Sequence, residues 1–174
     1  GAFVIALLLL VLSGMVLIGT LPLRIEPVDG TDFPPAMLTI ISASTGGWLL
    51  GCGMATMLLG HWYLTATGMP LRPLVWGTRL FLIAVVLRLM NVVVVLTMGA
   101  ATLRETLLHT HFIWGLLRVI AGLVAPLVLA LLAANTLKYR NTQSATGVLF
   151  AAVVMLFIGE AAALLLARDL HWPL

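Results

Sequence analysis

The chain has 174 residues, of which 62% are hydrophobic and 9% are charged. Soluble domains carry roughly 25% charged residues, so this composition excludes a protein whose surface is covered by water. Nine Lys and Arg against six Asp and Glu give a formal charge of +3. The basic residues are scattered and form no stripe of the kind that binds nucleic acid. The sequence therefore predicts a membrane protein without a nucleic-acid partner.

Five apolar segments are long enough to cross a bilayer, which requires about 20 predominantly apolar residues. None alternates with the period of two that barrel strands show, and helices satisfy every backbone polar group in lipid. We therefore expect one all-α domain over residues 1–174, an integral membrane bundle in contact with the lipid bilayer. The expected spans are 2–20, 36–66, 74–100, 108–137 and 144–167.

The first expected span follows Gly1 without an initiator Met. A signal peptide would show a basic region before its apolar core and a small-residue cleavage site after it. Neither feature is clear around residues 2–20. We expect this segment to be a retained helix, and we expect residues before Gly1 to be missing or processed.

The connections between spans are short, and proline or polar residues define them. Residues 21–35 include four prolines, three acids and one Arg, which predicts an outer loop of restricted shape that docks another subunit. Residues 67–73 predict a tight turn, and residues 141–144 can cap the last helix. Consecutive helices are expected to be antiparallel neighbours.

Basic residues set the expected orientation. The connections at 67–73 and 138–143 contain Arg and Lys but no acid, so the positive-inside rule places them in the cytoplasm. The N-terminus is then inside and the C-terminus outside, and we expect a bacterial cytoplasmic membrane. An interfacial aromatic belt is predicted from Trp62, Tyr63, Trp76, Tyr139 and Trp172.

Small residues form a stripe in the span 36–66. Gly47, Gly51 and Ala55 recur at a spacing of four, which lets another helix approach closely. The stripe indicates packing within the bundle or against a partner subunit, or alternatively a slot for a flat ligand or lipid tail. Cys52 is the one cysteine of the chain and is expected to be a small buried hydrophobe.

Four polar residues lie deep inside spans, where lipid-facing positions are unfavourable for them. Arg88, Asn91, Arg118 and Glu160 have similar depths when the helix rise is counted from the expected outer ends. We therefore expect them to meet in one layer. The simplest interpretation is an ion pair between Arg118 and Glu160 that fixes helix order, with Arg88 left for a ligand or another chain.

Charge balance suggests a binding function for this layer. Two guanidiniums and one carboxylate leave an excess of +1, which is hard to tolerate in a low dielectric. A quinone carbonyl, a haem propionate, a lipid phosphate or a carboxylate of another subunit would complete it. Trp114 and His111 lie on the stripe of Arg118 and extend the candidate cofactor site. Pro126 is expected to free a carbonyl near Gly122 and to kink the helix there.

The four histidines raise the possibility of haem b or a metal. His61 lies near the inner end of its span, far from His109, His111 and His171. His109 and His111 are separated by about 200° around one helix, so they do not clasp one haem. We expect interfacial hydrogen-bonding histidines and no metal site, with a site built from the three outer histidines as the alternative. No hydrolytic triad, phosphate loop or metalloprotease motif is present, so catalysis by this chain alone is not expected.

Residues 114–127, WGLLRVIAGLVAPL, and residues 159–162, GEAA, resemble the final helices of the NrfD and DmsC type membrane anchor subunits. The resemblance implies a helical bundle that binds quinone and docks iron–sulfur subunits. The chain has fewer expected spans than members of that family, which puts an intact quinone site in doubt.

Three functions are consistent with these features. The first is a non-catalytic membrane subunit of a larger electron-transferring complex, respiratory or photosynthetic, that contacts other membrane subunits. The second is a redox anchor subunit that itself binds quinone or haem. The third is a small transporter or channel in which Arg88, Arg118 and Glu160 line a path for an anion or a proton.

Overall fold

The computed structural model describes residues 36–65, 70–98, 105, 109–170 and 172–173, and the regular structure in them is helical. Four helical spans are long and apolar enough to cross a membrane. Three are the helices α2 (Ala36–Thr65), α3 (Arg72–Met98) and α7 (Thr142–Leu170). The fourth runs without interruption through α5 (Phe112–Val119), the π-helical turn η1 (Ile120–Val124) and α6 (Ala125–Lys138). The expected span 2–20 and the loop 21–35 lie outside the described residues.

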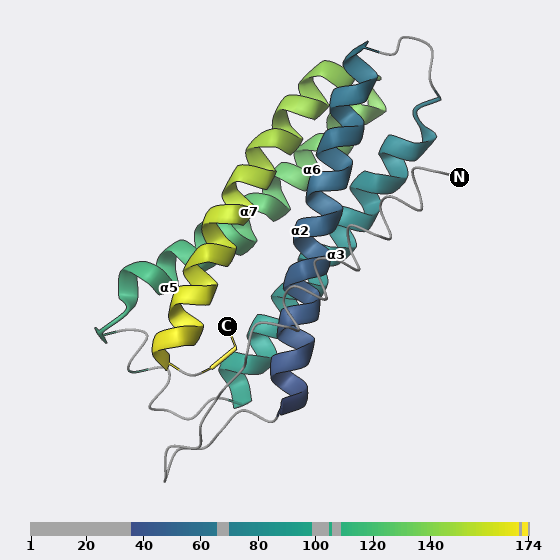
Figure 1. Cartoon of the computed structure of the whole chain (residues 1–174). Helices are drawn as coiled ribbons and strands as arrows, with labels where there is room; N and C mark the ends of the chain where they lie inside the picture. The colour runs from purple at the N-terminus through teal and green to yellow at the C-terminus, as the bar shows by residue number, and fades with distance from the viewer. Residues whose placement is uncertain (1–35, 66–69, 99–104, 106–108, 171, 174) are drawn as a thin grey trace.

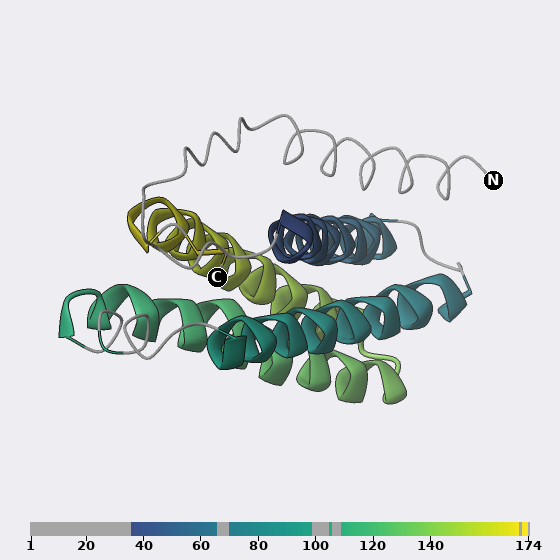
Figure 2. The same cartoon turned by 90° about the horizontal axis from the view of Figure 1, so that it is seen from below.

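The four spans form an antiparallel bundle (Figure 1). Seen from below, α2 and α7 form one layer, and α3 and the α5–α6 helix form the other (Figure 2). Each span contacts its neighbours in the chain, and α2 also contacts α7, which closes the bundle. The expectation that consecutive helices are antiparallel neighbours is therefore confirmed for these spans.

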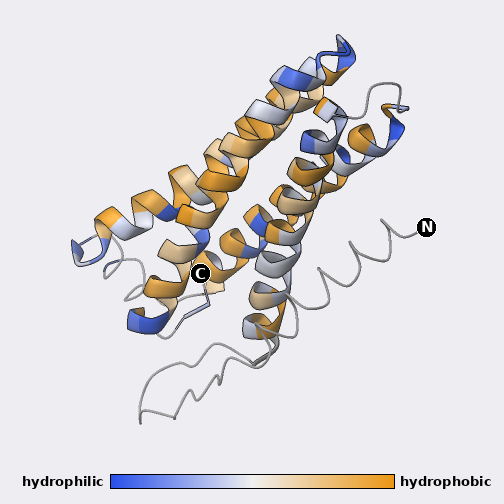
Figure 3. Cartoon of the chain, turned by 45° about the horizontal axis from the view of Figure 1, so that its top comes forward, coloured by the Kyte–Doolittle hydropathy of each residue, from blue (hydrophilic) through white to orange (hydrophobic). Residues whose placement is uncertain are grey.

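The outer surface of the bundle is apolar on every span. Ile40, Ile113 and Leu164 have exposed fractions of 61%, 75% and 64%. Hydrophilic residues gather mainly at the helix ends, while the helix middles are largely hydrophobic (Figure 3). Such a surface suits contact with hydrocarbon rather than with water. The described part of the chain is thus an all-α bundle with the properties of an integral membrane protein.

Two clusters of buried apolar side chains form the core of the bundle. The smaller cluster comprises Leu38, Val95 and Leu166, near the ends at which α2 begins and α3 and α7 end. The larger cluster fills the rest of the bundle and includes Leu49, Phe81, Ala133, Leu149 and Leu156. Along α2, α3 and α7, most of the buried residues between the two clusters are polar or small, so they define a separate layer.

The turn between α6 and α7 shows why the chain reverses there. Arg140 has a left-handed backbone with φ of 57°, and its N–H and that of Asn141 donate to the carbonyls of Leu137 and Thr136, as in a Schellman motif. The Asn141 side chain then accepts a hydrogen bond from the N–H of Ser144 at 3.0 Å. The expected cap of the last helix is confirmed.

Aromatic residues occur near the same end of the bundle. Trp62 and Trp76 are both 60% exposed and Tyr139 is 84% exposed, consistent with an interfacial belt. The Arg79 guanidinium lies 5.6 Å from the Trp76 ring centre. Tyr63 differs from the expectation because it is 7% exposed, and its hydroxyl donates to the Pro70 carbonyl at 2.6 Å. This hydrogen bond links the C-terminal part of α2 to the residues directly before α3.

Candidate functional site: a buried layer of two arginines and one glutamate

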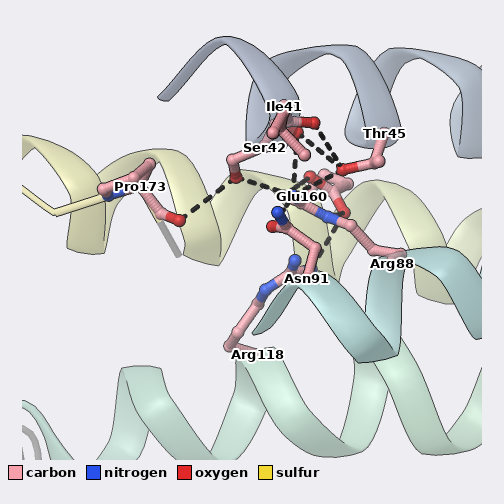
Figure 4. Close-up of polar contacts among 8 residues, drawn as sticks. All are labelled: Ile41, Ser42, Thr45, Arg88, Asn91, Arg118, Glu160 and Pro173. Carbon is pink, nitrogen blue, oxygen red and sulfur yellow. Dashed lines mark hydrogen bonds and ion pairs between the residues drawn. The ribbon is translucent and has the colours of Figure 1, made fainter. Parts of the chain in front are cut away.

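A layer of polar side chains separates the two apolar clusters, and we call it the arginine layer. Each span contributes to it, and every member is buried. Its members are Ser42 on α2, Arg88 and Asn91 on α3, Arg118 on α5 and Glu160 on α7. Figure 4 shows Arg88 and Arg118 approaching Glu160 from different helices.

Glu160 is the centre of the layer and binds both arginines. Its Oε2 lies 2.9 Å from Nη2 of Arg88, and its Oε1 accepts from Nε of Arg88 at 3.1 Å. Oε1 also accepts from Nη1 of Arg118 at 2.9 Å. One buried carboxylate thus joins three helices, and the three groups together carry a formal charge of +1.

Arg88 is the more completely bonded of the two arginines. Its Nε and Nη2 form a bidentate pair with the two oxygens of Glu160. Its Nη1 donates to the carbonyl and the hydroxyl of Ser42, both at 2.8 Å. Longer contacts of 3.4 Å reach the Thr45 hydroxyl and the Asn91 side-chain oxygen. The Ser42 hydroxyl in turn donates to the carbonyl of Pro173 at 3.1 Å, so the C-terminal segment is linked to the layer.

Within the described residues, Arg118 forms hydrogen bonds through one of its three guanidinium nitrogens. Its Nη1 donates to Glu160, whereas its Nε and Nη2 are buried without a hydrogen-bond partner among the described residues. Leaving a charged donor buried and unsatisfied costs at least about 1–3 kcal/mol. Because the side chain of Arg118 is only 3% exposed, bulk water does not supply hydrogen-bond acceptors for these two nitrogens.

Glycines let the helices close around the charged groups. A Cβ atom on Gly46 would lie 3.1 Å from Oε2 of Glu160, and one on Gly122 would lie 2.7 Å from Nη1 of Arg118. The backbones of Gly122 and Gly159 touch, since a Cβ on Gly159 would collide with the Cα of Gly122. The carboxylate therefore enters the layer beside a close approach of α7 to the α5–α6 helix.

The helix that carries Arg118 changes its pitch directly after it. Residues Ile120–Val124 form a π-helical turn, in which the N–H of Ala125 donates to the carbonyl of Ile120. Pro126 has no N–H and its ring would clash with the carbonyl four residues earlier, that of Gly122. The wider π turn accommodates this, and it is the local feature found where a kink was expected. Turns of this kind are frequent at functional sites.

The layer confirms part of what the sequence predicted and corrects another part. Arg88, Asn91, Arg118 and Glu160 do meet in one layer, and the Arg118–Glu160 ion pair is confirmed. The expectation that Arg88 is left over is wrong, because Arg88 binds Glu160 through two nitrogens. Arg88 and Glu160 lie the same rise, about 15 Å, before the last residues of α3 and α7. Among the described residues, Arg118 is the arginine of this layer whose Nε and Nη2 lack hydrogen-bond partners.

Other candidate residues lie outside this network. Trp114 is 43% exposed, and His111 is half-buried at the start of α5, so neither joins the layer in the part of the chain that the structure describes. Gly47, Gly51 and Ala55 are buried on α2; a ligand slot along them stays a prediction. The cofactor-binding role of Trp114 and His111, like that of the four polar residues in the layer, also stays a prediction.

Four residues that contact the charged groups or let the helices close around them were not predicted from the sequence: Ser42, Thr45, Gly46 and Gly159. A signal for the first two exists in the sequence, since Ser42 and Thr45 are hydroxyl residues spaced by three in an apolar span and therefore share a helix face. The two glycines carry no such signal, because their role depends on which helix passes them.

The histidines and acids do not gather into a metal site in the described residues. His61 and His109 are exposed, and no group of three or more His, Cys, Asp or Glu side chains in that part of the chain is placed to hold a metal ion. His171 lies outside it.

Comparisons with protein-family profiles, with curated protein sequences and with solved structures find no match to this chain.

Proposed function

We propose that this protein is a non-catalytic integral membrane subunit of a larger, electron-transferring complex, and that its arginine layer holds a ligand with oxygen acceptors. The observation that carries the proposal is the bare side of Arg118, where two buried guanidinium nitrogens lack a partner among the described residues. Ionisable groups inside membrane spans commonly mark functional sites. An acceptor from outside this set of residues would satisfy the guanidinium.

The charge of the arginine layer supports a role beyond helix packing. A single carboxylate bound to Arg88 alone would give a neutral pair, so the second arginine is not needed to compensate Glu160. Replacing buried ion pairs by apolar residues is often neutral or stabilising. Charge compensation therefore does not explain the second guanidinium, whereas a binding function would.

The electron-transfer part of the proposal is supported by the resemblance of residues 114–127 and 159–162 to quinone-binding anchor subunits. These two segments contain Arg118 and Glu160, and they are the segments that touch at Gly122 and Gly159. A quinone carbonyl or a haem propionate would be one such acceptor, and a lipid phosphate or a carboxylate of another subunit would be another. Other membrane subunits would be the partners.

Purification of the tagged full chain from its native membranes in a mild detergent tests this function. We expect copurifying subunits that carry a redox centre, together with quinone in the organic extract or a b-type band in the reduced-minus-oxidised spectrum. A chain that purifies alone, without quinone and without a redox band, would contradict the electron-transfer assignment.

A transporter or channel is the second candidate, and the π-helical turn beside Arg118 favours it. π-Helical turns are frequent at functional sites, and buried charges within membrane spans often mark ion or proton paths. Liposomes containing the purified chain would show anion or proton flux that Arg118→Leu removes. Absence of flux above that of empty liposomes would leave the subunit function in place.

We further propose five spans with the N-terminus inside and the connections at 67–73 and 138–143 in a bacterial cytoplasm. A cysteine at Thr142 in a Cys52→Ala background should react with an impermeant reagent from the cytoplasmic side alone. A cysteine at Asp169 is the matched control and should react from the opposite side. The reverse pattern would invert the proposed orientation.

A further inference from the structure

We infer that the free edge of the Arg118 guanidinium binds a lipid-borne monoanion with two acceptor oxygens, a phosphodiester or a carboxylate. This inference rests on the proposed ligand site and narrows the chemical class of its ligand. It follows from the geometry of the two arginines, from the charge of the layer and from the depth of Arg118.

The two arginines use different edges of their guanidinium groups. In this planar group, Nε–H and one N–H of Nη2 point in parallel along one edge and match the two oxygens of a carboxylate or phosphate. Arg88 binds Glu160 through this edge. Arg118 binds Glu160 through Nη1, and its Nε and Nη2 are the two nitrogens without a partner in the described residues. The unused edge of Arg118 is therefore the one that binds two oxygens at once.

The charge of the layer selects a monoanion. The two arginines and Glu160 sum to +1, and an unbalanced charge in a low dielectric is strongly unfavourable. A quinone carbonyl presents one neutral oxygen, which would leave both the charge and one N–H uncompensated. A phosphodiester or a carboxylate supplies one negative charge and two oxygens.

The depth of Arg118 points to a membrane lipid as the source. The fourth span has 27 residues, about 40 Å of helix, against about 30 Å of hydrocarbon. From Phe112, the first residue of α5, to Arg118 the helix rises about 9 Å. With the span centred, Arg118 lies about 4 Å inside the hydrocarbon boundary, within reach of a lipid headgroup or of a fatty-acid carboxylate anchored there.

The surroundings of Arg118 offer a route for such a lipid. Of the eight residues of α5, which the structure describes in full, Arg118 alone is buried. Ile113, Leu116 and Val119 on the same helix are 75%, 46% and 43% exposed, so acyl chains would lie directly beside it. A headgroup would reach the Arg118 guanidinium from this lipid-facing side of α5 rather than through the core of the bundle.

Lipid binding by the purified full chain tests the inference. Native mass spectrometry of the lipid-depleted protein would follow rebinding of phosphatidylglycerol, oleate, decylubiquinone and dioleoylglycerol, the last being uncharged and without phosphate. We expect one anionic lipid to bind per chain and the two uncharged ligands to bind at least tenfold more weakly. Preference for phosphatidylglycerol would identify a phosphodiester, and preference for oleate a carboxylate.

Arg118→Lys and Arg79→Lys form a matched pair of variants. Lysine keeps the positive charge and can still bind Glu160, but it lacks the two-donor edge. Arg118→Lys should weaken anionic lipid binding at least tenfold. Arg79→Lys, on the exposed face near the start of α3, should leave it unchanged. The wild-type lipid comparison does not depend on either variant folding.

Several results would overturn the inference, and they separate it from the proposed function. Equal binding of dioleoylglycerol would show that acyl chains alone are recognised. Binding of decylubiquinone alone, lost in Arg118→Lys, would refute the anion class and leave a ligand-binding subunit in place. A copurifying subunit that is lost in Arg118→Lys, with no lipid bound, would assign the edge to a partner's carboxylate. No ligand and no subunit dependent on Arg118 would remove both proposals.

Discussion

The arginine layer and the larger apolar cluster are built from the same spans, but their stability depends on different interactions. In the apolar cluster, Phe81, Leu149 and Leu156 are fully buried, and each is stabilised by non-directional contacts with many neighbours. In the arginine layer, Glu160 is stabilised by ionic hydrogen bonds to two specific partners. A substitution in the cluster removes contacts, whereas a substitution in the layer leaves a charge behind.

This difference predicts how the two regions respond to combined substitutions. Losses in the apolar cluster should accumulate, because each change enlarges a cavity. Losses in the arginine layer should be reversed once every charge has been removed, because the unfavourable term is the charge without a partner. The following predictions test the contrast, and all refer to unfolding in lipid-depleted detergent micelles.

Glu160→Leu should have the largest effect of a single change. It leaves the guanidiniums of Arg88 and Arg118 buried with no carboxylate, and we expect the free energy of unfolding to fall by about 5 kcal/mol. Changing Arg118 and Glu160 together should not restore stability, because Arg88 is still charged. The triple change of Arg88, Arg118 and Glu160 to Leu should recover most of the loss, as measured by denaturant titration.

The matched control is a pair of changes in the apolar cluster. Phe81→Ala should cost about 3–4 kcal/mol, and adding Leu149→Ala should increase the loss. If the triple Leu variant of the layer were as unstable as the sum of its single variants, the distinction between the two regions would be lost.

The two arginines should differ from each other. Arg88→Leu removes the bidentate pair with Glu160 and the bonds to Ser42, so we expect a loss of about 3–5 kcal/mol. Arg118→Leu removes one bond to Glu160 but also two buried donors that lack partners in the described residues, so about 1–2 kcal/mol is expected. Thermal unfolding of the two variants side by side measures the difference. Equal losses would mean that the second edge of Arg118 is satisfied in the protein.

The glycine contact beside the layer should tolerate no side chain. Gly159→Ala would force the backbones of Gly122 and Gly159 apart, and overpacking of this kind costs about 1–3 kcal/mol. Gly147→Ala lies in the same helix with nothing within 4 Å of the added Cβ, so it should stabilise the protein by about 0.5–1 kcal/mol. Opposite signs for these two glycines in α7 are the expected result, and a loss at both would contradict the geometry.

The smallest effect is expected at the turn between α6 and α7, far from the layer. Arg140 has a φ of 57°, a conformation that Gly adopts without the penalty of a side chain. Arg140→Gly should raise the free energy of unfolding by up to about 1 kcal/mol, the left-handed penalty less the backbone entropy of glycine. Asn141→Ala, which removes the cap of α7, should lower it by about 1 kcal/mol. A gain at Arg140 similar to the changes in the arginine layer would contradict the ranking of the two regions.

The sequence by itself determined the membrane-spanning character of the described helices and the depth of their polar residues. Apolar length gives the spans, and the fixed rise per residue gives how far along each helix a side chain lies. The number of apolar residues in each span and the rise per residue were enough to predict the ion pair between Arg118 and Glu160. They also showed that the buried charge does not balance.

Only the tertiary structure decided which arginine binds both oxygens of Glu160. It also decided which arginine has a two-donor edge without a partner in the described residues. That choice depends on the rotation of each helix about its axis and on the distance between helices, neither of which follows from depth. The hydroxyl of Ser42 and the missing side chain of Gly46 favour Arg88, and the close contact of Gly122 with Gly159 lets Arg118 reach Glu160 with Nη1. Helix packing thus distinguishes two arginines that sequence position alone treats as equivalent.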